Sequence, residues 1–116
     1  MKMTTAIEDY ALSSTIEGLS PQTISVYKFA LGVFARHIGD LEVEDITTDD
    51  VKKFLGYLRT DYKPNRPTGR DDPLSTASIH RYWKSLRSFF KWCEAEHGIP
   101  RPEADIKMPS FTNKEV

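Results

Sequence analysis

Two stretches of the chain repeat one pattern, SPQTISVYKFALGVF (residues 20–34) and STASIHRYWKSLRSF (residues 75–89). Each begins with Ser, has a second hydroxyl residue three positions later, and then places Ile, Tyr, Leu and Phe at the same offsets. Apolar residues at intervals of three and four predict one buried face of an α-helix, and Ser is a preferred N-cap. The repeat therefore predicts two long helices, ending near Ile38 and near His97, each directly before a Gly.

Two further segments have helical periodicity, one from about Thr5 to Glu17 and one from about Thr48 to Thr60. A short helical turn is expected near residues 103–106. No segment of useful length alternates between apolar and polar residues as a half-buried strand does. The predicted fold class is therefore all-α.

The four predicted helices begin in two different ways. Thr5 with Glu8, and Thr47 with Asp50, have the spacing of a capping box, in which the acid occupies the positive end of the helix dipole. The two repeated helices begin with hydroxyl residues and have no acid in the first turn. That arrangement suits an external anion such as phosphate, but Ser also caps helices well without any ligand, and both interpretations stay open.

Length and composition limit what the chain can be. With 116 residues, of which 39% are hydrophobic, it is long enough for one helical domain and too short for two. The single cysteine, Cys93, forms no internal disulfide, and neither a secretory leader nor a run of about 18 apolar residues is present. We expect a cytoplasmic protein.

The sequence has no pattern typical of a metal site or a nucleotide site. The histidines His37, His80 and His97 have no spacing suited to a metal ion, and no glycine-rich phosphate loop occurs. We therefore expect no cofactor, no small-molecule substrate and no catalytic residue in this chain.

Charge is unevenly distributed along the chain, although the formal net charge is only −1. Residues 75–101 carry five bases against two acids, and residues 41–61 carry six acids against three bases. On a helical wheel, Arg81, Lys84 and Lys91 lie opposite the apolar face, with Arg87 at its flank. Because a solvated helix usually mixes charges of both signs, this basic face is a candidate contact surface.

The helix from Ser20 to Ile38 has two apolar faces rather than one. The first contains residues such as Leu31 and Phe34, and the second contains Val26, Phe29 and Val33. A helix that is apolar on two sides is expected to lie between two neighbours. We predict that this helix is sandwiched in the core.

Three segments occur in the order that is typical of a known family, namely LSPQTISVYKFALGVFARHIG, LEVEDITTDDVKKFLGYL and LSTASIHRYWKSLRSFFKWCEAEHGI. They resemble the N-terminal core-binding, or SAM-like, domain of the tyrosine recombinase (phage integrase) family. The resemblance implies a SAM-like orthogonal bundle of four to five helices. It also implies a DNA-binding domain over residues 1–109, followed by residues 110–116 as the start of a linker to a separate C-terminal catalytic domain.

The resemblance implies that this domain binds double-stranded DNA at a recombination site and clamps it together with the catalytic domain. Copies of the full-length protein would assemble on DNA as a tetramer. The catalytic tyrosine and its partners would lie outside this chain. The implied DNA-binding residues are Thr23, Ser25, Lys28, Ser75, Thr76, Ser78, Arg81, Lys84, Arg87 and Lys91.

Two features leave other interpretations open. Trp92 lies off the main apolar face of its helix, and the helix from about Thr48 to Thr60 is acidic. A helical protein-interaction domain that contacts a partner through both features, without DNA binding, is therefore the alternative function. The segment from Asp61 to Pro73 is expected to be a mobile loop, in which three basic residues either contact DNA or are simply solvated.

Overall fold

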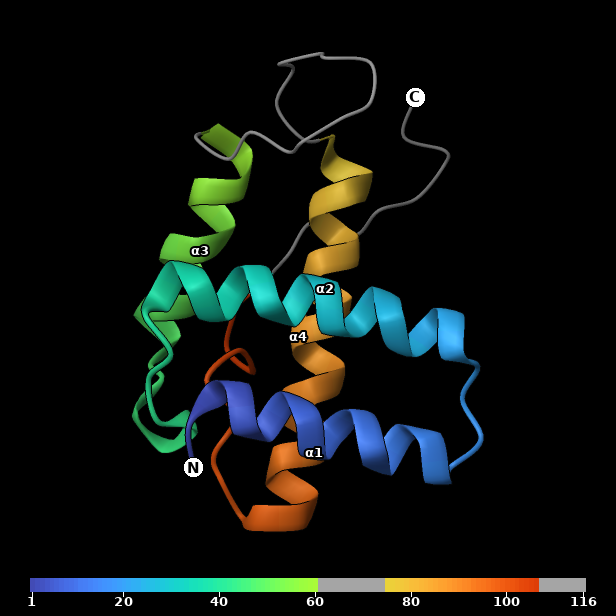
Figure 1. The fold of residues 1–116 in the computed structure, drawn as a ribbon. Coiled ribbons are helices and arrows are strands. Elements are labelled where there is room, and N and C mark those ends of the chain that lie inside the picture. Colours follow the sequence, from blue (N-terminus) through green and yellow to red (C-terminus); the bar gives the residue numbers. More distant parts are fainter. Residues whose placement is uncertain (61–74, 107–116) are drawn as a thin grey trace.

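The computed structural model describes residues 1–60 and 75–106, and Figure 1 shows its fold. The expected loop at 61–73 and the expected linker at 110–116 lie outside the described residues. Within the described part no strand occurs, although an isolated antiparallel bridge pairs Lys2 with Glu42. The all-α prediction is confirmed. The elements are α1 (Met3–Ile16), α2 (Pro21–Ile38), the short 3-10 helix η1 (Val43–Asp45), α3 (Thr48–Thr60) and α4 (Thr76–His97).

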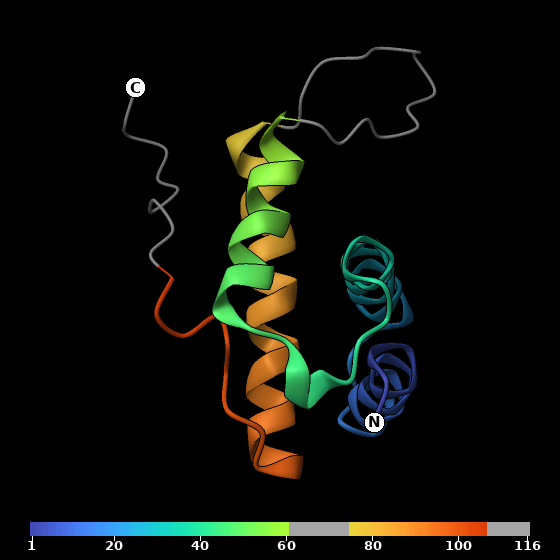
Figure 2. The same ribbon diagram turned by 90° about the vertical axis from the view of Figure 1, so that its left-hand side faces the viewer.

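The helices form two layers. In Figure 2, α1 and α2 lie side by side in one layer, and α3 and α4 lie side by side in the other. Figure 1 shows that α1 and α2 run across α4. Both α2 and α4 contact each of the other three helices, so the two repeated helices are central to the bundle.

Aromatic rings fill the space between the layers. Phe34 of α2 meets Phe54 of α3 at a centroid distance of 5.0 Å and Phe90 of α4 at 6.1 Å, both edge to face. Phe89 contacts Phe90 at 5.3 Å in the same manner. All four side chains are buried, and edge-to-face pairs are a favoured aromatic geometry. The apolar positions that repeat in the sequence therefore make one shared core.

Three of the four predicted helix starts are confirmed. The Ser20 Oγ accepts a hydrogen bond from the Thr23 backbone N–H, and the Ser75 Oγ accepts one from Ser78, each at 3.1 Å. At α3, Thr47 accepts from the Asp50 N–H while Asp50 accepts from the Thr47 N–H, as a capping box requires.

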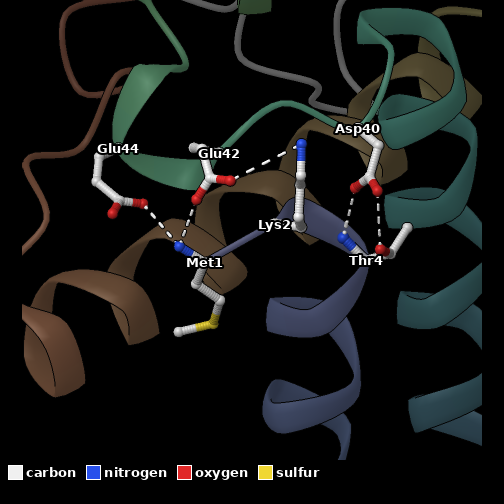
Figure 3. Close-up of polar contacts among 6 residues, drawn as sticks. All are labelled: Met1, Lys2, Thr4, Asp40, Glu42 and Glu44. Carbon is white, nitrogen blue, oxygen red and sulfur yellow. Dashed lines mark hydrogen bonds and ion pairs between the residues drawn. The ribbon is translucent and has the colours of Figure 1, made fainter.

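The predicted start of α1 is wrong. The helix begins at Met3, and its N-cap residue Lys2 provides no side-chain cap. The acid comes instead from the far end of α2: Asp40 accepts hydrogen bonds from the Thr4 backbone N–H at 2.8 Å and from the Thr4 Oγ1 at 3.0 Å (Figure 3). Thr5 and Glu8 therefore do not form the expected capping box.

The acidic residues that follow α2 also form ion pairs within the fold. Figure 3 shows the Met1 amino group between Glu42 and Glu44, at 2.6 and 3.4 Å from their Oε1 atoms. The hydrogen bond to Glu42 raises the pKa of the Met1 amine. Lys2 adds a second positive charge 3.8 Å from the Glu42 carboxylate. The acidic side of the molecule is thus partly neutralised by the chain's own first residues.

The prediction that α2 is sandwiched between two neighbours holds for its C-terminal half but fails for its N-terminal half, although the helix contacts α1, α3 and α4. Leu31 and Phe34 are fully buried and Val33 is nearly so, but Val26 is 55% exposed and Phe29 is 59% exposed. No element within residues 1–60 and 75–106 covers these two side chains. The N-terminal half of α2 therefore presents apolar surface to its surroundings.

Two side-chain hydrogen bonds join the layers. The Tyr10 hydroxyl lies 2.6 Å from the Ser88 Oγ, and the Trp92 Nε1 donates to the Ser13 Oγ at 3.1 Å. The Trp92 ring also packs against Tyr10 at a centroid distance of 5.5 Å. Trp92 thus attaches α4 to α1, which is a contact within the chain.

Candidate nucleic-acid interface

Four cations lie on one side of α4. Arg81, Lys84, Arg87 and Lys91 are all exposed, and their spacings of three and four residues place them on successive turns of the helix. We call them the basic stripe. No acidic residue occurs in α4 before Glu94. Among the residues that the structure describes, no ion pair involves any member of the stripe.

Packing, and not ion pairing, stabilises α4, and this allows four like charges to lie on one side of the helix. Like charges three or four residues apart destabilise an isolated helix by a few tenths of a kcal/mol per pair. The opposite side of α4 buries Ile79, Leu86, Phe89 and Phe90, and burial of each such side chain is worth about 1.5–3 kcal/mol. The burial of these side chains therefore outweighs the repulsion among the four cations of the stripe.

A groove separates α2 from the first half of α4. It encloses about 420 Å³, its walls are mostly apolar, and we call it the α2–α4 groove. Predicted site residues line it, but so do residues that were not predicted. The lining residues are Ser25, Val26, Phe29 and Ala30 of α2 with Ser78, Arg81, Tyr82 and Ser85 of α4.

A second hollow lies along the basic stripe itself. It is lined by Tyr27 of α2 and by Lys84, Arg87, Ser88 and Lys91 of α4. Figure 1 shows the N-terminal half of α2 projecting beyond α4 on the side away from α3. Because Tyr27 belongs to that half, this second hollow lies between the basic stripe and the projecting part of α2.

The structure does not bring all of the predicted DNA-binding residues to the α2–α4 groove or to the second hollow. Lys28 lies 3.6 Å from the Glu8 carboxylate of α1, so an acid already balances its charge. Thr23 is half-buried, and its hydroxyl accepts a hydrogen bond from Ser20. Ser75 and Thr76 are exposed at the first turn of α4. Ser25, Ser78 and the basic stripe are the predicted residues that adjoin the two hollows.

The family model for the phage integrase N-terminal SAM-like domain matches residues 7–98. The chain belongs to this family. The match covers all four α-helices except the first residues of α1, and it confirms both the resemblance and the SAM-like fold. It is a match to the N-terminal domain of the family, and no catalytic domain is matched. Comparisons with curated proteins and with solved structures find no match.

In this integrase-family domain, several residues that line the two hollows were not expected from the sequence, and they include polar residues, such as Ser85 and Ser88, as well as apolar ones. Val26 and Phe29 were assigned to a buried face, and Tyr82 to the core of α4, yet all three line the α2–α4 groove. The three-residue spacing of Val26 and Phe29 indicates that they share a face of the helix. Whether another helix covers that face depends on the crossing of α2 over α4, which the local pattern does not specify.

The hydroxyl residues at the starts of α2 and α4 act as caps within this domain. Each cap satisfies one backbone amide of its first turn, although a helix start has up to four amides without an intrahelical partner. The geometry confirms the capping interpretation and leaves phosphate binding as a proposal.

No three His, Cys, Asp or Glu side chains of residues 1–60 and 75–106 come together as metal ligands. No helix in the same ranges is long and apolar enough to cross a membrane. Burial raises the pKa of the Cys93 thiol to about 12, so this cysteine is a thiol within the core.

Proposed function

We propose that the chain binds double-stranded DNA as the N-terminal domain of a site-specific tyrosine recombinase. The observation that carries this proposal is the basic stripe of α4, whose four exposed cations have no acidic partner among the described residues. Membership of the integrase family supports it. The proposed contact residues are Ser25, Ser78 and the basic stripe, which adjoin the two hollows, together with Thr23, Lys28, Ser75 and Thr76, which line neither.

Phosphate groups are the ligands that suit the stripe. Lys and Arg side chains that neutralise phosphates release counterions, which provides most of the sequence-independent affinity for DNA. The stripe spans about three helical turns, and none of its cations is paired with an acid of residues 1–60 or 75–106, so DNA binding breaks no ion pair within those residues. Ser25 and Ser78 lie beside Arg81 and can donate further hydrogen bonds to phosphate oxygens.

The rest of the recombinase would supply the chemistry. We propose that residues 1–109 form the DNA-binding domain and that residues 110–116 begin a linker to a catalytic domain, so that the two domains clamp the recombination site. Copies of the full-length protein would assemble on that site. The family match to an N-terminal domain supports this division.

A second candidate function is contact with another protein. Leu12 and Ile16 are 60% and 77% exposed, and they lie one turn apart on the solvent side of α1. Exposed apolar side chains that adjoin one another favour a partner protein. Trp92 does not support this function, because its indole is engaged with Ser13 and Tyr10.

Fluorescence anisotropy of a labelled duplex, titrated with the domain at several salt concentrations, tests the proposal. We expect weak binding with little sequence preference, and an affinity that falls steeply as salt rises. Absence of binding at low salt, together with binding to a partner protein, would replace DNA binding with the second function.

A further inference from the structure

The α2–α4 groove is unlike the rest of the proposed DNA surface, because its walls are mostly carbon. Val26 and Phe29, which are both more than half exposed, line it together with Ala30 and Tyr82. The Ser85 hydroxyl donates to the Arg81 carbonyl oxygen at 3.1 Å, so its proton is already in use. Arg81, Ser25 and Ser78 can still meet a phosphate group here, but Val26, Phe29 and Ala30 have no polar side-chain atom to offer it.

The neighbouring charge indicates what kind of partner covers these side chains. Arg81 lines the groove and is also the first residue of the basic stripe, so whatever fills the groove lies beside groups that favour a polyanion. An apolar protein surface would leave those cations uncompensated. An occupant that combines a strongly negative backbone with small apolar groups would match both the cations and the apolar walls.

Duplex DNA has one small apolar group on the edges of its base pairs. The C5-methyl of thymine projects into the major groove, where it makes apolar contacts with protein side chains. The major groove is about 12 Å wide and a helix with its side chains is about 10–12 Å across, so the projecting half of α2 fits within it. The stripe on α4 then lies toward the flanking phosphates.

We propose that Val26 and Phe29 contact thymine methyl groups in the major groove and give the domain a preference for thymine at the contacted positions. This inference rests on the proposed function. It assigns base recognition to apolar residues of α2 and phosphate binding to the cations of α4. The two roles can be separated by experiment because they depend on different helices.

The test compares two duplexes of equal length, one of alternating dA and dT and one of alternating dA and dU, which differ only in the C5-methyl groups. We expect the domain to bind the thymine duplex about fourfold more tightly for each methyl group that it buries, equivalent to about 0.8 kcal/mol. The Phe29→Ala and Val26→Ala variants should lose this preference while still binding both duplexes. Equal affinity of the unmodified domain for the two duplexes would overturn the inference but not the proposed function.

Two control variants complete the test. Leu12→Ala removes an apolar side chain of similar exposure from α1 and should leave the preference unchanged. Lys84→Ala should weaken binding to both duplexes by the same factor. If a Val26→Ala/Phe29→Ala double variant kept the full preference and a folded circular dichroism spectrum, the assignment would be wrong. Failure of the unmodified domain to bind either duplex at low salt would overturn the proposed function as well.

Discussion

Asp40 lies 36 residues beyond Thr4 in the sequence and nevertheless caps α1, the helix in which Thr4 is the second residue. Its two carboxylate oxygens accept from the Thr4 amide and from the Thr4 hydroxyl. Asp40 does this from a left-handed backbone conformation, with φ of 54°, which disfavours most L-residues and is best tolerated by Asn and Asp. One residue thus ends the turn after α2 and holds the start of α1.

Substitutions at Asp40 should separate its two roles. Asp40→Gly removes the cap, but glycine adopts a positive φ without steric cost. We therefore expect a loss of about 1 kcal/mol in the free energy of unfolding. Asp40→Ala should lose more, because it adds backbone strain of about 1–2 kcal/mol. Asp40→Asn keeps an acceptor and tolerates the conformation, so it should cost least. Urea unfolding of the three variants measures this order, and equal stabilities for Gly and Asn would show that the cap contributes little.

A pair of phenylalanine substitutions tests the core. Phe89 is fully buried and meets Tyr10 edge to face at 5.6 Å, so Phe89→Ala should lower the free energy of unfolding by about 3–5 kcal/mol. Phe29→Ala removes the same atoms from an exposed position and should change stability by no more than about 0.5 kcal/mol. Thermal or urea unfolding compares them, and a loss below about 1 kcal/mol for Phe89→Ala would contradict the core described here.

The basic stripe makes a prediction about salt dependence. Replacing Lys84 by Ala should leave stability nearly unchanged, since exposed substitutions seldom exceed about 0.5 kcal/mol. The slope of log affinity against log salt should fall in magnitude by about 0.9, and all sequences should be weakened alike. Arg81→Ala and Arg87→Ala should act in the same way, and a loss of about 1–3 kcal/mol on one preferred site only, as expected of a guanidinium that pairs with a guanine edge, would contradict the assignment of the α4 cations to phosphate.

The control for the stripe is Lys52→Ala on α3, where the lysine is equally exposed but belongs to an acidic helix start. This variant should change neither the affinity nor the salt slope. A loss as large as that of Lys84→Ala would place the DNA surface on the other side of the domain.

Cys93 should be almost unreactive in the folded protein. Its side chain is 1% exposed, and burial raises the pKa of the thiol to about 12, so little thiolate exists at pH 8. Reaction with a disulfide reagent such as dithionitrobenzoate should be slow in buffer and rapid in denaturant. A rate in buffer close to that of a free thiol would contradict the packing around α4.

Local chemistry explains what could be predicted from the sequence. Ser20 and Ser75 cap their helices through amides three residues away, and the exposure of the basic stripe follows from its spacing around α4. Both depend on neighbours in the sequence. The start of α1 and the neutralisation of Lys28 by Glu8 could not be predicted, because the partner residues come from other parts of the chain. The exposure of Val26 and Phe29 likewise depends on where α2 crosses α4.

The distance between Thr4 and Asp40 also affects the order in which the protein can fold while it is being made. At about 5–20 residues per second, the ribosome adds Asp40 about 2–7 s after Thr4, whereas helices form within about a microsecond. With only 14 residues, α1 is too short to be stable in water by itself. We expect a peptide of residues 1–38 to show little helix at residues 3–16 by nuclear magnetic resonance, and a stable helix there would refute this view. Helix α1 would then become stable only after Asp40 has been synthesised, seconds after its own residues.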